Sequence, residues 1–371
     1  RWMNMVWVAV GTFILSMLWR WALKQKQRRA KRKELEDETE SSSLAARWLA
    51  DTKMVRGGIA ALLAIVLVFP WVVDTYQANI MVLALIFVVL GLGLNITVGL
   101  AGLLDLGYVA FFLVGAYTYG VLYQFTGLGF WACLPIGGLM GALFGVLLGF
   151  PILRLRGDYL AIVTLGFGSI AKIVIENWEE VFSGAKGIAG IPRPGLFGME
   201  MGISAATTYT YYLMILMVIF TIFVTNRLKD SRIGRAWMAL REDEIACVAM
   251  GVDMARTKLS AYALGAFWAG LVGVIFAARN TYINPNSFTF MESAIVLSIV
   301  VLGGMGSIVG VIIAALVLIL MPEYLRAFAD YRMLVFGGVM VLMMIFRPQG
   351  LIANVRKTYD LSRVKGEVKH D

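Results

Sequence analysis

The apolar parts of this sequence contain few residues that could take part in chemistry. The polar residues inside or beside its long apolar runs are Asn95, Asp105, Arg279, Asn280 and Glu292. An ionisable group at membrane depth is costly and commonly functional, so Asp105 and Glu292 are the first candidates. Each could instead lie near an interface or pair locally. A proton relay would need several acids or histidines in series, and the sequence does not supply them.

Enzymatic chemistry and metal binding are disfavoured for the same reason. The single histidine, His370, and the two cysteines, Cys133 and Cys247, are too few for a zinc site or an iron–sulfur cluster. The stretch GLGLNITVG lacks the Lys-Ser/Thr pair that grips phosphates in a nucleotide-binding loop. The chain is therefore expected to be no enzyme and to bind no cofactor. If it drives uphill transport, other subunits must bind and hydrolyse the ATP.

One polar segment, residues 227–258, lies between long apolar runs. It carries seven Lys/Arg and five Asp/Glu in a helix-like pattern. Within it, residues 239–250 are predicted to form a short helix that ends at Gly251, because glycine readily adopts the left-handed cap conformation. Asp253 is then expected to cap the next helix. Such a helix suits insertion into a groove on a soluble partner, although it could also lie on the lipid headgroups.

The composition places these residues in a membrane protein. The 371 residues are 60% hydrophobic and only 15% charged, against about 25% charged in soluble domains. The apolar runs are continuous rather than alternating, which favours helices over a barrel. The prediction is an all-α polytopic bundle of ten to eleven transmembrane helices, with lipid as solvent. The net charge of +9 is interpreted as the Lys/Arg bias of cytoplasmic loops, not as nucleic-acid binding.

The predicted spans differ in how regular they are. The glycine-rich piece 91–123 contains Asn95, Thr97 and Asp105, and is expected to be broken or re-entrant. The GGMGS sequence at 303–307 indicates either two spans with a tight turn or one broken helix. Small residues spaced three and four apart in 259–278 predict a close packing face. The spans are 4–22, 57–73, 80–98, 107–123, 130–153, 159–175, 208–226, 259–278, 291–321 and 332–346.

The distribution of Lys and Arg predicts orientation and domain organisation. Basic segments alternate with loops poor in Lys/Arg, which places 227–258 and the tail in the cytoplasm. The expected parts are an N-terminal transmembrane helix (1–23), a charged cytoplasmic linker (24–56), a membrane core (57–352) and a cytoplasmic C-terminal tail (353–371).

Four stretches in combination resemble a known family. They are GLGLNITVGLAGLLDLGYVAFFLVGAYTYG, FPILRLRGDYLAIVTLGFG, GRAWMALREDEIACVAMGV with the following KLSAYALGAFWAGLVGVIFAAR, and SFTFMESAIVLSIVVLGGMGS with FRPQGL. They cover most of residues 80–352. The chain resembles the M-type membrane permease subunits of branched-chain amino acid ABC importers.

The resemblance implies a set of partners in a bacterial inner membrane. These are a second, homologous permease, two cytoplasmic ATPase subunits that bind the ATP, and a periplasmic protein that delivers Leu, Ile or Val. Segment 227–258 then corresponds to the family's coupling segment. Of the usual Glu-Ala-Ala and following Gly, only Ala246 and Gly251 match in place, with Glu244 displaced by one position. The implied coupling residues are Arg241, Glu242, Asp243, Glu244, Ala246 and Gly251.

A hydrophobic substrate, which the resemblance implies, leads to an expected substrate path, and three alternative functions are also considered. A hydrophobic substrate needs no ladder of charges, so the apolar stretch 91–118 is the expected lining. The residues predicted to line the path are Asn95, Thr97, Tyr108, Phe111, Phe112 and Glu292. A urea or short-chain amide ABC permease is the nearest alternative. An ion-coupled secondary transporter is disfavoured by the few membrane-depth acids, and a non-transporting scaffold by the glycine-broken helices.

Overall fold

The computed structural model describes residues 66–153, 155, 157–195, 202–324, 337–338, 341 and 350–352. The chain divides into two compact units, residues 1–69 and 70–371, and of the first unit only residues 66–69 are described. The predicted span 4–22, the linker 24–56 and the tail 353–371 lie outside the described residues. So do residues 57–65 and most of the predicted span 332–346.

Seven helices of the described residues are long and apolar enough to cross a bilayer, which takes about 20 residues. They confirm the predicted all-α polytopic class. A shorter apolar helix, α14 (Ile308–Tyr324), follows them. Five of them are the helices α5 (Val109–Thr126), α6 (Phe130–Ile152), α7 (Asp158–Asn177), α9 (Ile203–Lys229) and α12 (Met254–Asn280). The other two combine elements: Thr75–Leu100 joins α4 (Thr75–Leu94) to a π-helix, and Pro285–Gly303 joins a 3-10 turn to α13 (Phe290–Gly303).

Helices α9 and α12 are longer than their apolar runs predicted. Each has 27 residues, whereas the sequence indicated 208–226 and 259–278. The polar ends of both segments remain helical because a helix ends where its capping groups are satisfied, not where its apolar residues stop. At the start of α12, for example, the Asp253 carboxylate accepts a hydrogen bond from the Arg256 backbone N–H at 3.1 Å.

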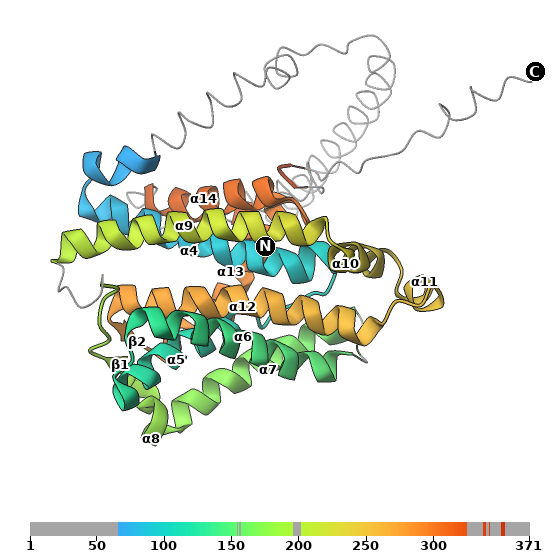
Figure 1. Ribbon diagram of the computed structural model, residues 1–371, viewed down its shortest axis with the longest axis horizontal. Helices are drawn as coiled ribbons and strands as arrows, with labels where there is room; N and C mark the ends of the chain where they lie inside the picture. The colour runs from blue at the N-terminus through green and yellow to red at the C-terminus, as the bar shows by residue number, and fades with distance from the viewer. Residues whose placement is uncertain are drawn as a thin grey trace, which may run out of the picture. The chain divides into compact units, whose positions relative to one another are not determined.

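Helix α12 packs closely against α4, α5 and α6 (Figure 1). A methyl group at Gly270 would collide with the Gly137 carbonyl oxygen of α6, and one at Gly273 with the Phe112 carbonyl of α5. A methyl group at Gly265 would lie 3.1 Å from the Gly93 carbonyl oxygen. These contacts confirm the predicted small-residue packing face, because close approach of helix backbones in a membrane requires small side chains.

The glycine-rich piece after α4 is interrupted, as predicted. Helix α4 passes into the π-helix η1 (Asn95–Leu100), and irregular backbone follows before α5 begins at Val109. Gly102 in this break has φ +72°, a conformation that glycine tolerates best. Non-helical backbone at membrane depth is tolerated where protein covers it, and within residues 101–108 only Gly102 is exposed, while Leu104 and Leu106 are half-buried.

The GGMGS sequence forms a tight turn between two helices, which decides between the two predicted forms. Helix α13 ends at Gly303 and α14 begins at Ile308. Gly304 and Gly306 have φ of +102° and +85°. Gly303 and Gly310 are so close that a methyl group on either would overlap the other's backbone.

The two ends of the second unit carry different small elements (Figure 1). Helices α10 (Arg232–Glu242) and α11 (Glu244–Ala249) lie between α9 and α12. At the other end, α8 (Glu179–Phe182), the 3-10 turn η2 (Gly184–Lys186) and β1 (Ile188–Ala189) follow α7, and β2 (Tyr282–Ile283) and the 3-10 turn η3 (Pro285–Ser287) follow α12. Strands β1 and β2 pair antiparallel, with Ile188 opposite Ile283.

Candidate functional site

Helix α10 is anchored to the start of α12 by a buried tryptophan. The Trp237 indole N–H donates to the Thr257 carbonyl oxygen at 3.1 Å and to the Ser260 hydroxyl at 3.0 Å. Trp237 and Leu240 are buried. The helix begins at a capped residue, since the Ser231 hydroxyl accepts from the Gly234 N–H at 3.2 Å. The polar segment is therefore fixed to a transmembrane helix rather than lying loosely at the surface.

The predicted single helix over 239–250 is wrong, because the chain breaks at Asp243. This residue is extended, with φ −156° and ψ 112°, and separates α10 from α11. Its carboxylate accepts from the backbone N–H groups of Ile245 at 2.8 Å and Ala246 at 3.1 Å. An aspartate that can satisfy the free N–H groups of a new helix favours a cap over helix continuation.

The predicted end of the segment is confirmed. Gly251 has φ +81°, and the Val252 N–H donates to the Cys247 carbonyl oxygen at 3.0 Å. This is the left-handed glycine cap expected after a helix. Asp253 caps α12, also as predicted.

The acidic residues of the segment have different surroundings. The Glu244 carboxylate pairs with the Lys258 ammonium at 2.8 Å, and the Lys258 side chain is fully buried. Asp243 is used as a cap. Three large apolar side chains are exposed beside these charged residues: Ile245 is 70% exposed, Val248 51% and Met250 83%. Segment α10–α11 therefore presents an apolar surface, defined by these three residues, next to its charged positions.

Arg241 links the segment to the break after η1. Its guanidinium donates to the Gly99 carbonyl oxygen at 2.5 Å. Its aliphatic carbons cover Gly102, where a methyl group would lie 2.7 Å from the Arg241 Cγ. The glycine is thus required both by its positive φ and by the arginine stem.

The break is also tied to the turn between α13 and α14. The Asn95 side-chain oxygen accepts from the Gly306 N–H at 2.8 Å, and the Lys229 ammonium lies 3.5 Å from the Gly306 carbonyl oxygen. The Thr97 hydroxyl donates to the Leu94 carbonyl at 3.0 Å. Three interrupted parts of the chain, namely α10–α11, the 95–108 break and the 304–307 turn, are therefore joined by hydrogen bonds.

The other residues predicted to line a path are packed in the bundle. Tyr108 donates to the Gly265 carbonyl oxygen at 2.9 Å. Phe111 lies against Phe167, and Phe112 against Phe276, with ring centroids 6.0 and 5.0 Å apart. A cavity of about 310 Å³ between α5, α7 and α13 is lined by their neighbours but not by these three aromatic residues.

Glu292 is separated from the other predicted path residues. It lies in the first turn of α13 and is half-buried. Asn95 contacts Gly306, just beyond the other end of this 14-residue helix. That length corresponds to about 20 Å. Asn95 and Thr97 are thus brought close to the α10–α11 segment, and Glu292 is not.

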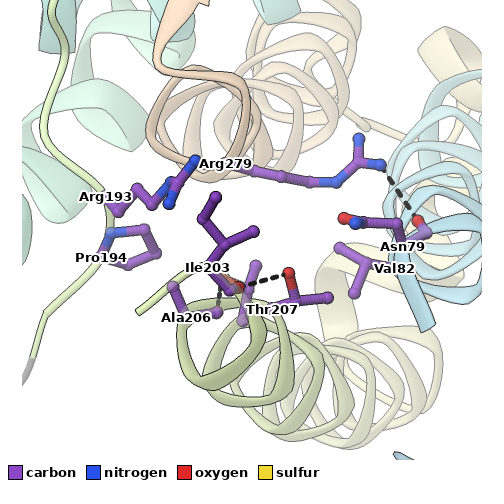
Figure 2. A pocket seen from close by; sticks show the side chains of 9 residues that line it. Asn79, Val82, Arg193, Pro194, Ile203, Ala206, Thr207 and Arg279 are labelled. Atoms are coloured by element: carbon purple, nitrogen blue, oxygen red, sulfur yellow. Dashed lines mark hydrogen bonds between the residues drawn. The ribbon is translucent and has the colours of Figure 1, made fainter. Parts of the chain in front are cut away.

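Two features were missed by reading the sequence. The first is the ion pair between Glu244 and the buried Lys258, because the sequence shows Lys258 only as the last residue of the polar segment. A small recess bordered by Arg193 and Arg279 joins parts of the chain that are far apart in sequence (Figure 2). The only signal for it was an arginine, Arg279, at the end of a long apolar run.

The fold and the site define a multi-pass α-helical membrane protein with an interrupted core helix bonded to a polar helix pair between two spans. Interrupted helices bonded in this way are typical of transport proteins. The chain belongs to the family described as branched-chain amino acid transport system / permease component, whose model matches residues 76–344.

Individual proteins that are similar to this chain carry names of the same kind. The high-affinity branched-chain amino acid transport system permease protein LivM of Escherichia coli (strain K12) is 49% identical over 331 residues, covering 83% of this chain and 78% of the relative. A probable LivM of Methanocaldococcus jannaschii is 22% identical, covering 72% and 90%. The E. coli permease protein LivH is also 22% identical, covering 72% and 91%. No solved structure matches the chain significantly.

Proposed function

We propose that this protein is the M-type permease subunit of an ABC importer that moves branched-chain amino acids into the cell. The observation that carries the proposal is the 49% identity to a LivM protein over 83% of the chain. The interrupted helix α4–η1 supports the transport role, because discontinuous transmembrane helices typically form the substrate sites of transporters. The weaker similarity to LivH supports pairing with a second, homologous permease.

In this proposal α10–α11 lies in the cytoplasm, where it meets two ATPase subunits. The Lys/Arg bias of segment 227–258 supports this side of the inner membrane. The apolar surface of Ile245, Val248 and Met250 suits a groove on a partner. The opposite end, with β1 and β2, then faces the periplasmic binding protein, and the tail 353–371 is cytoplasmic.

In this proposal ATP is bound and hydrolysed by the partners, and the chain passes on the resulting movement. A shift of α10–α11 acts on the Gly99 carbonyl through Arg241 and on the start of α12 through Trp237. The 95–108 break and the 304–307 turn move with it because Asn95 and Gly306 are bonded. The substrate binds and leaves as these interrupted parts change their arrangement.

The test is complementation of a strain that lacks its M-type permease. Expression of this chain together with the companion permease, ATPases and binding protein is expected to restore uptake of radiolabelled leucine, and both ATPases and the second permease are expected to co-purify with it. Uptake of urea without leucine would favour the amide permease. Leucine uptake without ATPase subunits would contradict the ABC class.

A further inference from the structure

A small recess borders α4, α9 and α12 at the end of the unit opposite α10–α11. Its volume is about 80 Å³. Arg193 comes from the segment after β1, Arg279 from the last turn of α12 and Asn79 from the first turns of α4. Figure 2 shows Arg279 extending across the recess towards Asn79, with Arg193 reaching in from the opposite wall.

Arg279 is only partly satisfied. Its Nη2 donates to the Asn79 carbonyl oxygen at 3.0 Å and its Nη1 to the Asn280 side-chain oxygen at 3.4 Å, while its Nε is buried without a hydrogen-bond partner among the described residues. Across that same part of the chain, no carboxylate pairs with Arg279 or with Arg193. Two guanidinium groups that share a recess without a counter-charge favour an anion, and the planar guanidinium matches a carboxylate.

The other walls of the recess suit the rest of an amino acid. The hydroxyls of Thr207 and Thr210 donate to helix carbonyls at 2.9 and 2.7 Å, which leaves their oxygens to accept from an ammonium group. Val82, Ile203 and Pro194 add apolar surface. A recess of this volume holds roughly five to eight waters, which is room for the charged end of an amino acid with its side chain reaching outside.

We propose that this recess binds the α-carboxylate of the amino acid substrate on the side from which the substrate enters. The proposal rests on the proposed function. Arg193 and Arg279 supply the charge, and the threonine oxygens receive the ammonium group.

The test compares two variants with one control in the purified importer, made of both permeases and both ATPases in lipid nanodiscs. Arg193→Gln removes an exposed arginine and is expected to fold normally. Arg279→Gln removes the half-buried one, and Arg279→Lys keeps the charge in case the bond to Asn79 matters for folding. Lys186→Gln is the matched control, because Lys186 is an exposed cation at the same end and outside the recess.

The readout is the shift in unfolding temperature on adding leucine or leucinamide, which lacks the carboxylate. Wild type and Lys186→Gln are expected to be stabilised by leucine and not by leucinamide. Arg193→Gln and Arg279→Gln are expected to need at least tenfold more leucine for the same shift, with partial rescue in Arg279→Lys. Equal leucine responses in all variants would overturn the proposal.

Two further outcomes separate the possible sources of failure. In the first, Arg193→Gln binds the ligand-free binding protein more weakly but responds to leucine as wild type does. This result would mean that the arginines contact an acidic side chain of the binding protein, and it would overturn the proposal. If wild type takes up no leucine in cells, the proposed function itself fails. If wild type transports and the variants bind leucine as wild type does, only the recess assignment fails.

Discussion

Arg241 makes a long-range contact from the polar segment, since its hydrogen-bond partner, Gly99, lies 142 residues earlier in the chain. The family resemblance implies a coupling role for Arg241, which would be met by contact with an ATPase. Although Arg241 is exposed, its guanidinium donates to the Gly99 carbonyl oxygen of η1, and its stem lies against Gly102. The geometry therefore favours Arg241 as a positioning residue that links the segment to the interrupted helix.

Arg241→Met is expected to uncouple transport from ATP hydrolysis. Methionine keeps an apolar stem over Gly102 but loses the charged hydrogen bond, which contributes about 1.5–3 kcal/mol. A loss of that size corresponds to roughly tenfold or more in a coupled equilibrium. The measurement is leucine transported per ATP hydrolysed in proteoliposomes, expected to fall roughly tenfold while hydrolysis continues.

Arg235→Met is the matched control for this variant. Arg235 lies on the same helix, is exposed, and donates to the Asp230 carbonyl at 2.8 Å within its own segment. Its transport ratio is expected to stay near that of wild type. A wild-type ratio in Arg241→Met would remove Arg241 from the coupling route.

Local residue roles could be predicted from the sequence, and long-range ones could not. The roles of Gly251 and Asp253 follow from neighbours within five residues, so their capping was predictable. The partners of Arg241 and Lys258 depend on how α10 and α11 meet η1 and α12. A charge pattern identifies the segment but not which of its charges point inward.

At the scale of elements, two of the implied coupling residues have structural roles within the segment. Asp243 caps α11, and Glu244 pairs with the buried Lys258. Reversing the charges of Asp243 and Glu244 together would remove the α11 cap and leave Lys258 buried without its partner. Such a variant would lose structure as well as contact with a partner. The outward side chains of α11 and the residue after it give a cleaner test.

Met250→Asp is expected to weaken binding of the ATPase subunits strongly with little effect on folding. Met250 is 83% exposed, so a charge there costs the folded chain little but would be desolvated in an apolar groove. The measurement is the ATPase recovered with the affinity-purified permease pair, expected to fall several-fold. Ile233→Asp, on the first turn of α10 and 47% exposed, is the control. Equal losses in both would assign the contact to the whole segment rather than to α11.

The break after α4 could be predicted because it depends on local amino-acid composition. The glycines and Asn95 in 91–123 indicated the break, because glycine weakens a helix and a polar amide in lipid needs a partner. The break at Asp243 was missed, because the amphipathic pattern around this residue also fits a continuous helix. Only the hydrogen bonds that Asp243 accepts at the start of α11 identify it as a cap. The ends of α9 and α12 were placed too far inward because only their apolar parts were counted.

At the scale of the whole second unit, two sites lie at opposite ends of the same helices. Arg279 stands near the end of α12 and Lys258 near its start, and Ile203 and Lys229 bound α9 in the same way. A 27-residue helix is about 40 Å long, enough to cross a bilayer. The recess bordered by Arg193 and Arg279 and the α10–α11 segment are therefore predicted to face different sides of the membrane.

Cysteine accessibility tests this arrangement directly. Lys186→Cys marks the β1–β2 end and Met250→Cys the α10–α11 end, and both positions are exposed. The native Cys133 and Cys247 are buried, so the wild-type chain gives the background. In spheroplasts a membrane-impermeant maleimide is expected to label Lys186→Cys and not Met250→Cys, and inside-out vesicles are expected to give the reverse. Labelling of both from one side would contradict the crossing, whereas a full reversal would place the Lys/Arg-rich segment outside, against the charge bias of the chain.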